Sequence, residues 1–276
     1  VWRRIGALDH PALPDWMQAW LPEPGLVSRG LEYSLPYAAG EAVARTLSPY
    51  AWGPFYRNPL EEIVARLDFA RVCAVEGPEF FVAATHVRDG KIRVFKGDAI
   101  TTDAILASAC LPTLFQAVTL PDPRTGEPEP FWDGGYTGNP ALFPLFEDRF
   151  PDDTIIININ PLHRDAQPVT TPEILNRINE ISFNSSLLRE LRAIDFVQRL
   201  IEERTIAEGR MKHPLIHMIM DDALMNDLSV ATKTVPVPSV LAQLRSAGRR
   251  AAGDFLAAHA DDLGKRQTAD LRAMFQ

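Results

Sequence analysis

The amino-acid sequence predicts an α/β protein, layered around a mainly parallel sheet. Candidate strands alternate with candidate helices along the chain, which is the pattern of layered α/β folds. Residues 154–160 are β-branched and almost wholly apolar, as expected for a strand that is covered on both faces. Residues 171–207 repeat apolar side chains at helical spacing, which predicts one long helix.

Composition places the chain among ordinary globular proteins and excludes several functions. The 276 residues carry 28 basic and 36 acidic side chains, and the net charge of −8 argues against nucleic-acid binding through phosphate neutralisation. Cys73 and Cys110 lie far apart and form no Cys-x-x-Cys pattern, so we expect neither a disulfide framework nor a zinc site. The histidines lack metal-binding spacing, and we expect no metal or organic cofactor. No apolar run is long enough to span a membrane.

The first part of the chain, residues 1–59, is irregular and rich in proline, tyrosine and tryptophan. It contains four of the five tryptophans, Trp2, Trp16, Trp20 and Trp52. Aromatic side chains favour the boundary between water and hydrocarbon, so this region could contact a membrane surface. The alternative is a wrapping segment whose tryptophans complete the core. We expect a cytoplasmic protein or one attached peripherally to a membrane.

Local signals predict the remaining elements in order. Asn58-Pro59 opens a short helix, because asparagine caps and proline suits the first turn. Asp89-Gly90 is a hairpin signal between two alternating strands. The predicted elements are helix 58–67, strands 80–86 and 91–95, helix 101–109, strands 118–120 and 129–132, helix 139–146, strand 154–160, helix 171–207, strand 215–220, and helices 240–259 and 268–275.

The most informative motif is Asp133-Gly134-Gly135, which directly follows an aromatic strand. The two glycines allow another backbone or a substrate to come close. An acid at the carboxyl end of a strand lies where α/β folds place their ligand crevice. We therefore predict that Asp133 ends a core strand and faces a crevice. The alternative is that Asp133 only caps a turn.

A second stretch gives the motif its specificity. Ala107-Ser108 ends a predicted helix that Pro112 stops, and by itself this pattern indicates only packing. Ala-Ser-x-x-x-Pro followed by Asp-Gly-Gly, however, resembles the patatin-like phospholipase family. The resemblance covers about residues 60–161. It implies a patatin-like hydrolytic α/β domain over 1–165, incomplete at its N-terminus, and a helical extension over 166–276.

The resemblance implies that Asp133 is the general base of a Ser-Asp dyad, with Gly134, Gly135, Ser108 and Pro112 as supporting motif residues. The family's Gly-x-Ser-x-Gly nucleophile segment is absent: no serine has glycine at both the second position before it and the second after it. Ser108 is a poor substitute because it lies in a helix and not at a strand–turn–helix elbow. We expect the recorded chain to lack the strand–helix units that carry the nucleophile.

The function that the resemblance implies is hydrolysis of lipid acyl esters, of the phospholipase A or lysophospholipase type. The serine would attack the ester while Asp133 accepts its proton, and this chain alone would be inactive. One alternative is a carboxylesterase or depolymerase acting on other apolar esters such as hydroxyalkanoates. Another is a non-catalytic interaction protein that retains the fold. An oligomer is possible. Asp221-Asp222 could bind a cation, but helix capping explains the pair better.

Overall fold

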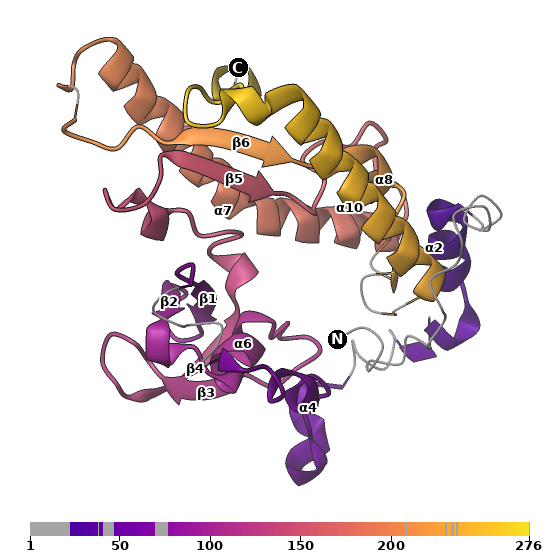
Figure 1. The fold of residues 1–276 in the computed structure, drawn as a ribbon. Helices are drawn as coiled ribbons and strands as arrows, with labels where there is room; N and C mark the ends of the chain where they lie inside the picture. Colours follow the sequence, from indigo (N-terminus) through magenta and orange to yellow (C-terminus); the bar gives the residue numbers. More distant parts are fainter. Residues whose placement is uncertain are drawn as a thin grey trace. The chain divides into compact units, whose positions relative to one another are not determined.

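The computed structural model describes residues 23–37, 39–40, 47–69, 77–207, 209–229, 231–232, 235 and 237–275. The chain divides into two compact units, one built mainly from Leu26–Asn139 and the other from Pro140–Ser229 and Ser239–Gln276. Each contains both helices and strands, so the mixed α/β composition is confirmed (Figure 1). The predicted domain boundary at residue 165 lies inside the second unit.

The first unit is organised around a four-stranded sheet. Its strands are β1 (Phe81–His86), β2 (Ile92–Lys96), β3 (Val118–Pro121) and β4 (Pro128–Asp133), and they lie in the order β2-β1-β4-β3. Every pair is antiparallel. Gly90 follows β1 with a φ of +65°, a conformation that glycine adopts at little cost, and the predicted hairpin between β1 and β2 is thereby confirmed.

Helix α6 (Thr102–Ser108) packs against strands β1, β3 and β4 and completes the core of this unit. Thr101 caps the helix by accepting the backbone N–H of Ala104 at 3.2 Å. The core residues include Val82, Ala84, Phe95, Ala104, Ala107, Leu120 and Phe131. The remaining short elements are η2 (Pro49–Phe55), α4 (Glu61–Val64), η3 (Gly97–Ala99) and η4 (Gly134–Tyr136), while α2 (Pro24–Glu32) precedes them in the chain.

The second unit contains a two-stranded parallel sheet of β5 (Asp153–Ile157) and β6 (Leu215–Ile219). The long helix α7 (Thr171–Glu202) connects the strands and packs Leu187, Leu191 and Ile194 against Ile156 and Ile216. A capping box, in which Thr170 and Glu173 bond each other's backbone N–H, begins α7 at the predicted residue. The other elements are η5 (Phe143–Phe146), α8 (Asp222–Asn226), α10 (Pro238–His259), η6 (Ala260–Asp262) and α11 (Leu271–Met274).

The prediction of a mainly parallel sheet is wrong for the described residues. Only β5 and β6 are parallel, and the larger sheet is antiparallel throughout. The connections explain the difference, because antiparallel neighbours can be joined by short turns whereas a parallel pair needs a long crossover. In the four-stranded sheet the turns at 87–91 and 122–127 are short. In the two-stranded sheet a long helix joins β5 to β6.

Strand β5 is covered on one face only, contrary to the expectation of cover on both. Thr154 and Ile156 are buried, but Ile155, Ile157 and Ile159 are 46%, 72% and 66% exposed. On β6 the corresponding face is covered, because His217, the register partner of Ile155, contacts the ring of Phe255 on α10 at 6.0 Å. The uncovered apolar surface therefore belongs to β5.

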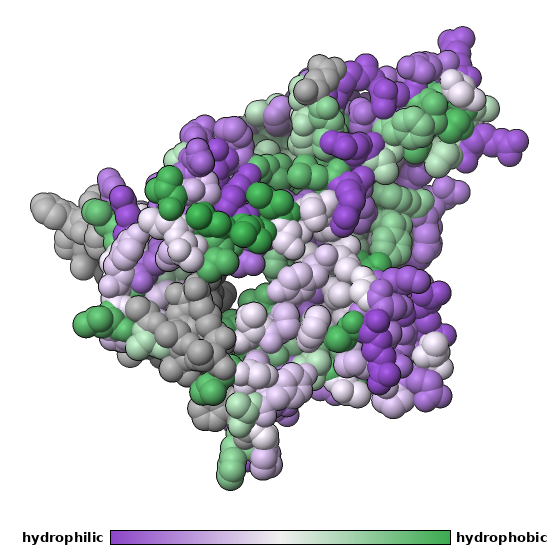
Figure 2. All heavy atoms as spheres, turned by 180° about the vertical axis from the view of Figure 1, so that it is seen from behind, coloured by the Kyte–Doolittle hydropathy of each residue, from purple (hydrophilic) through white to green (hydrophobic). Residues whose placement is uncertain are grey.

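Helix α7 also turns an unexpected face inward over its first half. Apolar residues at helical spacing, among them Ile174, Ile178 and Ile181, are exposed, while Asn176, Glu180 and Asn184 are buried. The buried carboxylate of Glu180 accepts two hydrogen bonds from the Arg164 guanidinium, at 2.6 and 2.8 Å, which offsets the cost of burying it. Exposed apolar side chains are visible in the space-filling view (Figure 2). Of the helices described, none has the length and apolarity needed to cross a bilayer.

We expect the 276-residue chain to be oligomeric or largely insoluble, because the apolar face of strand β5 carries no charged residue between Thr154 and Ile159 to discourage association. Size-exclusion chromatography with light scattering measures this directly. Ile157→Lys should reduce association and give a single soluble species. Ile178→Lys, on the exposed face of α7, should reduce association less. A wild-type monomer of 30.7 kDa would contradict the prediction.

Candidate functional site

Asp133 is the last residue of β4, which confirms its predicted place at the end of a core strand. It pairs with Ala84 of β1. Its backbone is held on both sides, since its N–H donates to the carbonyl of Cys110 at 2.8 Å and its carbonyl accepts the hydroxyl of Thr85 at 2.7 Å. Its carboxylate accepts the N–H of Gly135 at 2.7 Å. The sequence motif is thus fixed in one geometry.

The hydroxyl of Thr137 supports this arrangement through a hydrogen bond to Thr85. The Oγ1 atoms of Thr85 and Thr137 lie 2.9 Å apart. Thr85 has one hydroxyl proton, which it donates to the carbonyl of Asp133, so Thr137 must be the donor in the Thr137–Thr85 bond. Because Thr85 is buried, leaving its hydroxyl without a hydrogen bond would be costly. The chain of two bonds fixes the backbone that orients the Asp133 carboxylate.

Gly134 is the residue that lets β4 end against β1. A Cβ atom at this position would overlap the carbonyl oxygen of Ala83. Gly134 and Gly135 are buried and begin the short turn η4, and Asp133 caps that turn through its bond to Gly135. The capping alternative is therefore correct as a description of the hydrogen bond. It does not prevent the carboxylate, which retains a second oxygen, from accepting a proton.

The site stabilises the neutral, protonated form of Asp133 relative to its charged form, compared with a carboxyl group in water. Burial raises the pKa of Asp133, and the Gly135 N–H lowers it by less. Burial and the neighbouring Asp133 charge raise the pKa of Cys110 to about 11, so its thiol stays protonated near neutral pH. Burial followed by the charges of Asp133 and Cys110 raises the pKa of Tyr136. A carboxyl with a raised pKa is suited to exchange protons at working pH.

Ser108 and Pro112 lie where the sequence predicts them, Ser108 at the last residue of α6 and Pro112 after the helix ends. Ser108 is half-buried and follows a helical turn, not a strand–turn–helix elbow. In the part of the chain that the structure describes, no serine hydroxyl bonds to the Asp133 carboxylate. Trp2, Trp16 and Trp20 lie outside the described residues, as do Cys73 and the side chain of Trp52.

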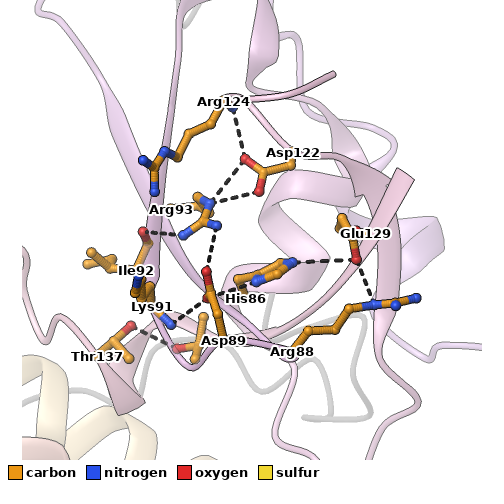
Figure 3. A network of polar contacts seen from close by, with 11 residues as sticks. His86, Arg88, Asp89, Lys91, Ile92, Arg93, Asp122, Arg124, Glu129 and Thr137 are labelled. Carbon is orange, nitrogen blue, oxygen red and sulfur yellow. Dashed lines mark hydrogen bonds and ion pairs between the residues drawn. The ribbon is translucent and has the colours of Figure 1, made fainter. Parts of the chain in front are cut away.

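A second polar cluster on the same sheet was not predicted from the sequence (Figure 3). Arg93 is buried on β2, and its Nε lies 2.8 Å from Asp122 and its terminal nitrogen 3.0 Å from Asp89. His86 Nδ1 lies 2.8 Å from Asp89, and Glu129 pairs with Arg88 at 2.8 Å. Both arginines are paired with carboxylates, so the cluster fastens the two hairpin turns to each other.

Asp122 shows the opposite electrostatic behaviour from Asp133. Burial by itself would raise the pKa of Asp122, but the Arg124 N–H and the Arg93 guanidinium outweigh it and lower the pKa. The carboxylate of Asp122 is thus committed to its arginine. The described residues contain no group of three or more histidine, cysteine or acidic side chains that could hold a metal ion.

Two polar groups of the second unit have structural roles. Asp221 caps α8 by accepting the N–H of Leu224 at 3.1 Å, which confirms the predicted helix capping for this residue. His217 is fully buried, with its ring nitrogens 2.9 Å from Asp153 and 3.0 Å from Thr268. Because Asp153 also accepts the N–H of Gly264, this pair ties the C-terminal loop to the sheet.

Comparison with known proteins adds no relative. No family model matches the chain, and no curated protein is similar to it. Any functional conclusion therefore depends on the residues themselves.

We predict that Gly134→Ala destabilises the fold by about 1–3 kcal/mol, because the added methyl group must displace the Ala83 backbone. Gly248→Ala in α10, where a Cβ meets no atom within 4 Å, is the matched control and should leave stability unchanged or raise it slightly. Urea unfolding of the two variants gives the comparison. Equal stabilities would show that the contact at Gly134 is not required.

Asp133→Asn should stabilise the protein at neutral pH and have little effect near pH 3. The folded-state pKa of Asp133 is raised, so stability is fully present below the unfolded value near 3.8 and is lost as the pH rises through the folded value. Asparagine keeps an oxygen for the Gly135 N–H without the buried charge. Thermal melts across this pH range measure the difference, and a variant less stable than wild type at pH 7 would contradict the prediction.

Proposed function

We propose that this chain supplies the general base of a patatin-like serine lipid acyl hydrolase, and that Asp133 is that base. The observation that carries the proposal is the state of Asp133. It is fixed at the end of β4 and held by Gly135, burial raises its pKa, and none of the described residues forms a cationic partner for it. A carboxylate that is oriented but not committed to a cation is available for proton transfer.

The reaction needs a serine that these 276 residues do not provide in a Gly-x-Ser-x-Gly segment. In the proposed complete enzyme, its Oγ attacks the acyl carbonyl while its proton moves to the Asp133 carboxylate. The tetrahedral intermediate collapses to an acyl-serine, and the alcohol portion leaves with that proton. Asp133 then takes a proton from water, whose oxygen attacks the acyl-serine, and the fatty acid departs as serine regains its proton.

We also propose that the complete enzyme has a patatin-like layered fold with further strand–helix units. The uncovered face of β5 supports it, because parallel strands are normally covered on both faces. The absence of a nucleophile elbow favours the second candidate, a non-catalytic interaction protein, for this chain acting alone. A carboxylesterase acting on hydroxyalkanoates would use the same base and differ only in the acyl group.

A fluorophosphonate probe, which labels activated serines, tests the assignment. The 276-residue chain should stay unlabelled and hydrolyse a short-chain ester no faster than its Asp133→Ala variant. A polypeptide that joins this sequence to its Gly-x-Ser-x-Gly segment should be labelled, and Asp133→Ala in it should lower kcat by about 100-fold or more.

Asp98→Ala, which removes an exposed acid from the same unit, is the matched control and should leave kcat unchanged. Two results would overturn the proposal. The first is full activity in Asp133→Ala. The second is activity of the 276-residue chain that disappears in Ser108→Ala, since Ser108 would then be the nucleophile.

A further inference from the structure

The segment η2 is fastened to the loop that follows α6 through the hydroxyl ends of two tyrosines. Tyr50 Oη accepts the N–H of Ala117 at 3.0 Å, and Tyr56 Oη accepts the N–H of Gln116 at 3.2 Å. The Gln116 side chain donates to the carbonyl of Pro49 at 3.1 Å. These three bonds hold residues 48–56 and 111–117 together, and each tyrosine oxygen accepts one backbone N–H.

Four apolar or aromatic side chains in or next to these two segments are exposed. Leu47, Tyr50, Phe55 and Leu114 are 50%, 57%, 86% and 40% exposed. We call these four residues the aromatic patch. Aromatic rings that are wet at one end and apolar at the other are typical of membrane–water interfaces. The Tyr50 hydroxyl oxygen accepts the N–H of Ala117, so it keeps this partner when the ring enters lipid.

Charge distinguishes the aromatic patch from the rest of the molecule. The chain has a net charge of −8, yet Arg57 is the only charged side chain from Leu47 to Asn58, and none occurs from Leu111 to Val118. The stretch from Leu47 to Asn58 therefore carries a single positive charge, that of Arg57, and the stretch from Leu111 to Val118 is uncharged. Phosphate-bearing lipid headgroups attract such a surface and repel the acidic remainder.

The aromatic patch is connected to the candidate site by one loop. Cys110, whose carbonyl accepts the N–H of Asp133, donates its thiol to the carbonyl of Gln116 at 3.2 Å. Gln116 is the residue that Tyr56 and Pro49 hold. A surface that docks at the patch would thus lie against the loop that contacts the proposed base.

From these contacts we propose that the aromatic patch docks the protein on a phospholipid surface. The inference rests on the proposed function, because a lipid acyl hydrolase must reach an aggregated substrate. Docking itself requires no hydrolysis. A second protein is a poorer occupant, because a stable protein–protein contact uses about 20 or more residues on each side. These two short segments offer far fewer.

Flotation with phosphatidylcholine vesicles, with and without phosphatidylglycerol, tests the proposal at a protein concentration where light scattering shows a single species. The wild-type chain should bind, and more strongly when phosphatidylglycerol is present. Phe55→Asp should lower the partition coefficient by about tenfold or more, because a buried phenylalanine contributes that much to transfer from water. Leu35→Asp is the matched control, since Leu35 is also 86% exposed, and it should bind as the wild type does.

The following results for the patch variants overturn the inference. Binding by Phe55→Asp equal to that of the wild type, or an equal loss in Leu35→Asp, would show that the aromatic patch is not the docking surface. A wild-type dimer that Phe55→Asp converts to a monomer would assign the patch to a second copy. Leu114→Asp provides a second variant, and circular dichroism confirms that each is folded. Vesicle binding without esterase activity in the longer polypeptide would refute the proposed function and leave this inference standing.

Discussion

The close approach of β4 to β1 is the constraint on which the candidate site depends. At Gly134 the chain lies so near the Ala83 carbonyl that a side chain would overlap it, and the turn η4 begins at this residue. This contact brings the backbone of Asp133 within reach of Thr85 and Cys110, which bond its carbonyl and its N–H. Glycine is required by packing at this position, since its role is close approach and not a left-handed backbone.

Two acids of the same sheet illustrate how environment separates structure from chemistry. Asp122 is buried beside Arg93, and the resulting bonds hold its pKa low, so its charge stabilises the hairpin turns. The Asp133 carboxylate accepts the Gly135 N–H and lies near a buried thiol, no described residue supplies it with a cation, and its pKa is raised. Burial acts on both carboxylates, and the presence or absence of an arginine decides which one remains free to exchange a proton.

The sequence predicted local features well because their signals are local. Asp89-Gly90 specified a turn, Thr101 a helix start, and the residues before Gly134 a strand that ends in Asp133. Strand direction was predicted wrongly for the first unit, where every pair is antiparallel, because an apolar strand pattern does not record the direction of its neighbour. Arg93 was missed for a related reason: a charged residue on a strand indicates solvent unless its distant partner, Asp122, is known.

The uncovered apolar face of β5 and the missing nucleophile point to the same kind of element. A strand–turn–helix unit offers an extended strand for a free sheet edge and a helix that can cover apolar side chains such as Ile157. At its turn it can also present a serine beside backbone N–H groups that stabilise an oxyanion. The β5 strand of a second copy could pair with the backbone groups at this edge. Its own exposed isoleucines would then also remain uncovered. Under the proposed function, a strand–turn–helix unit is suited to each of these two needs.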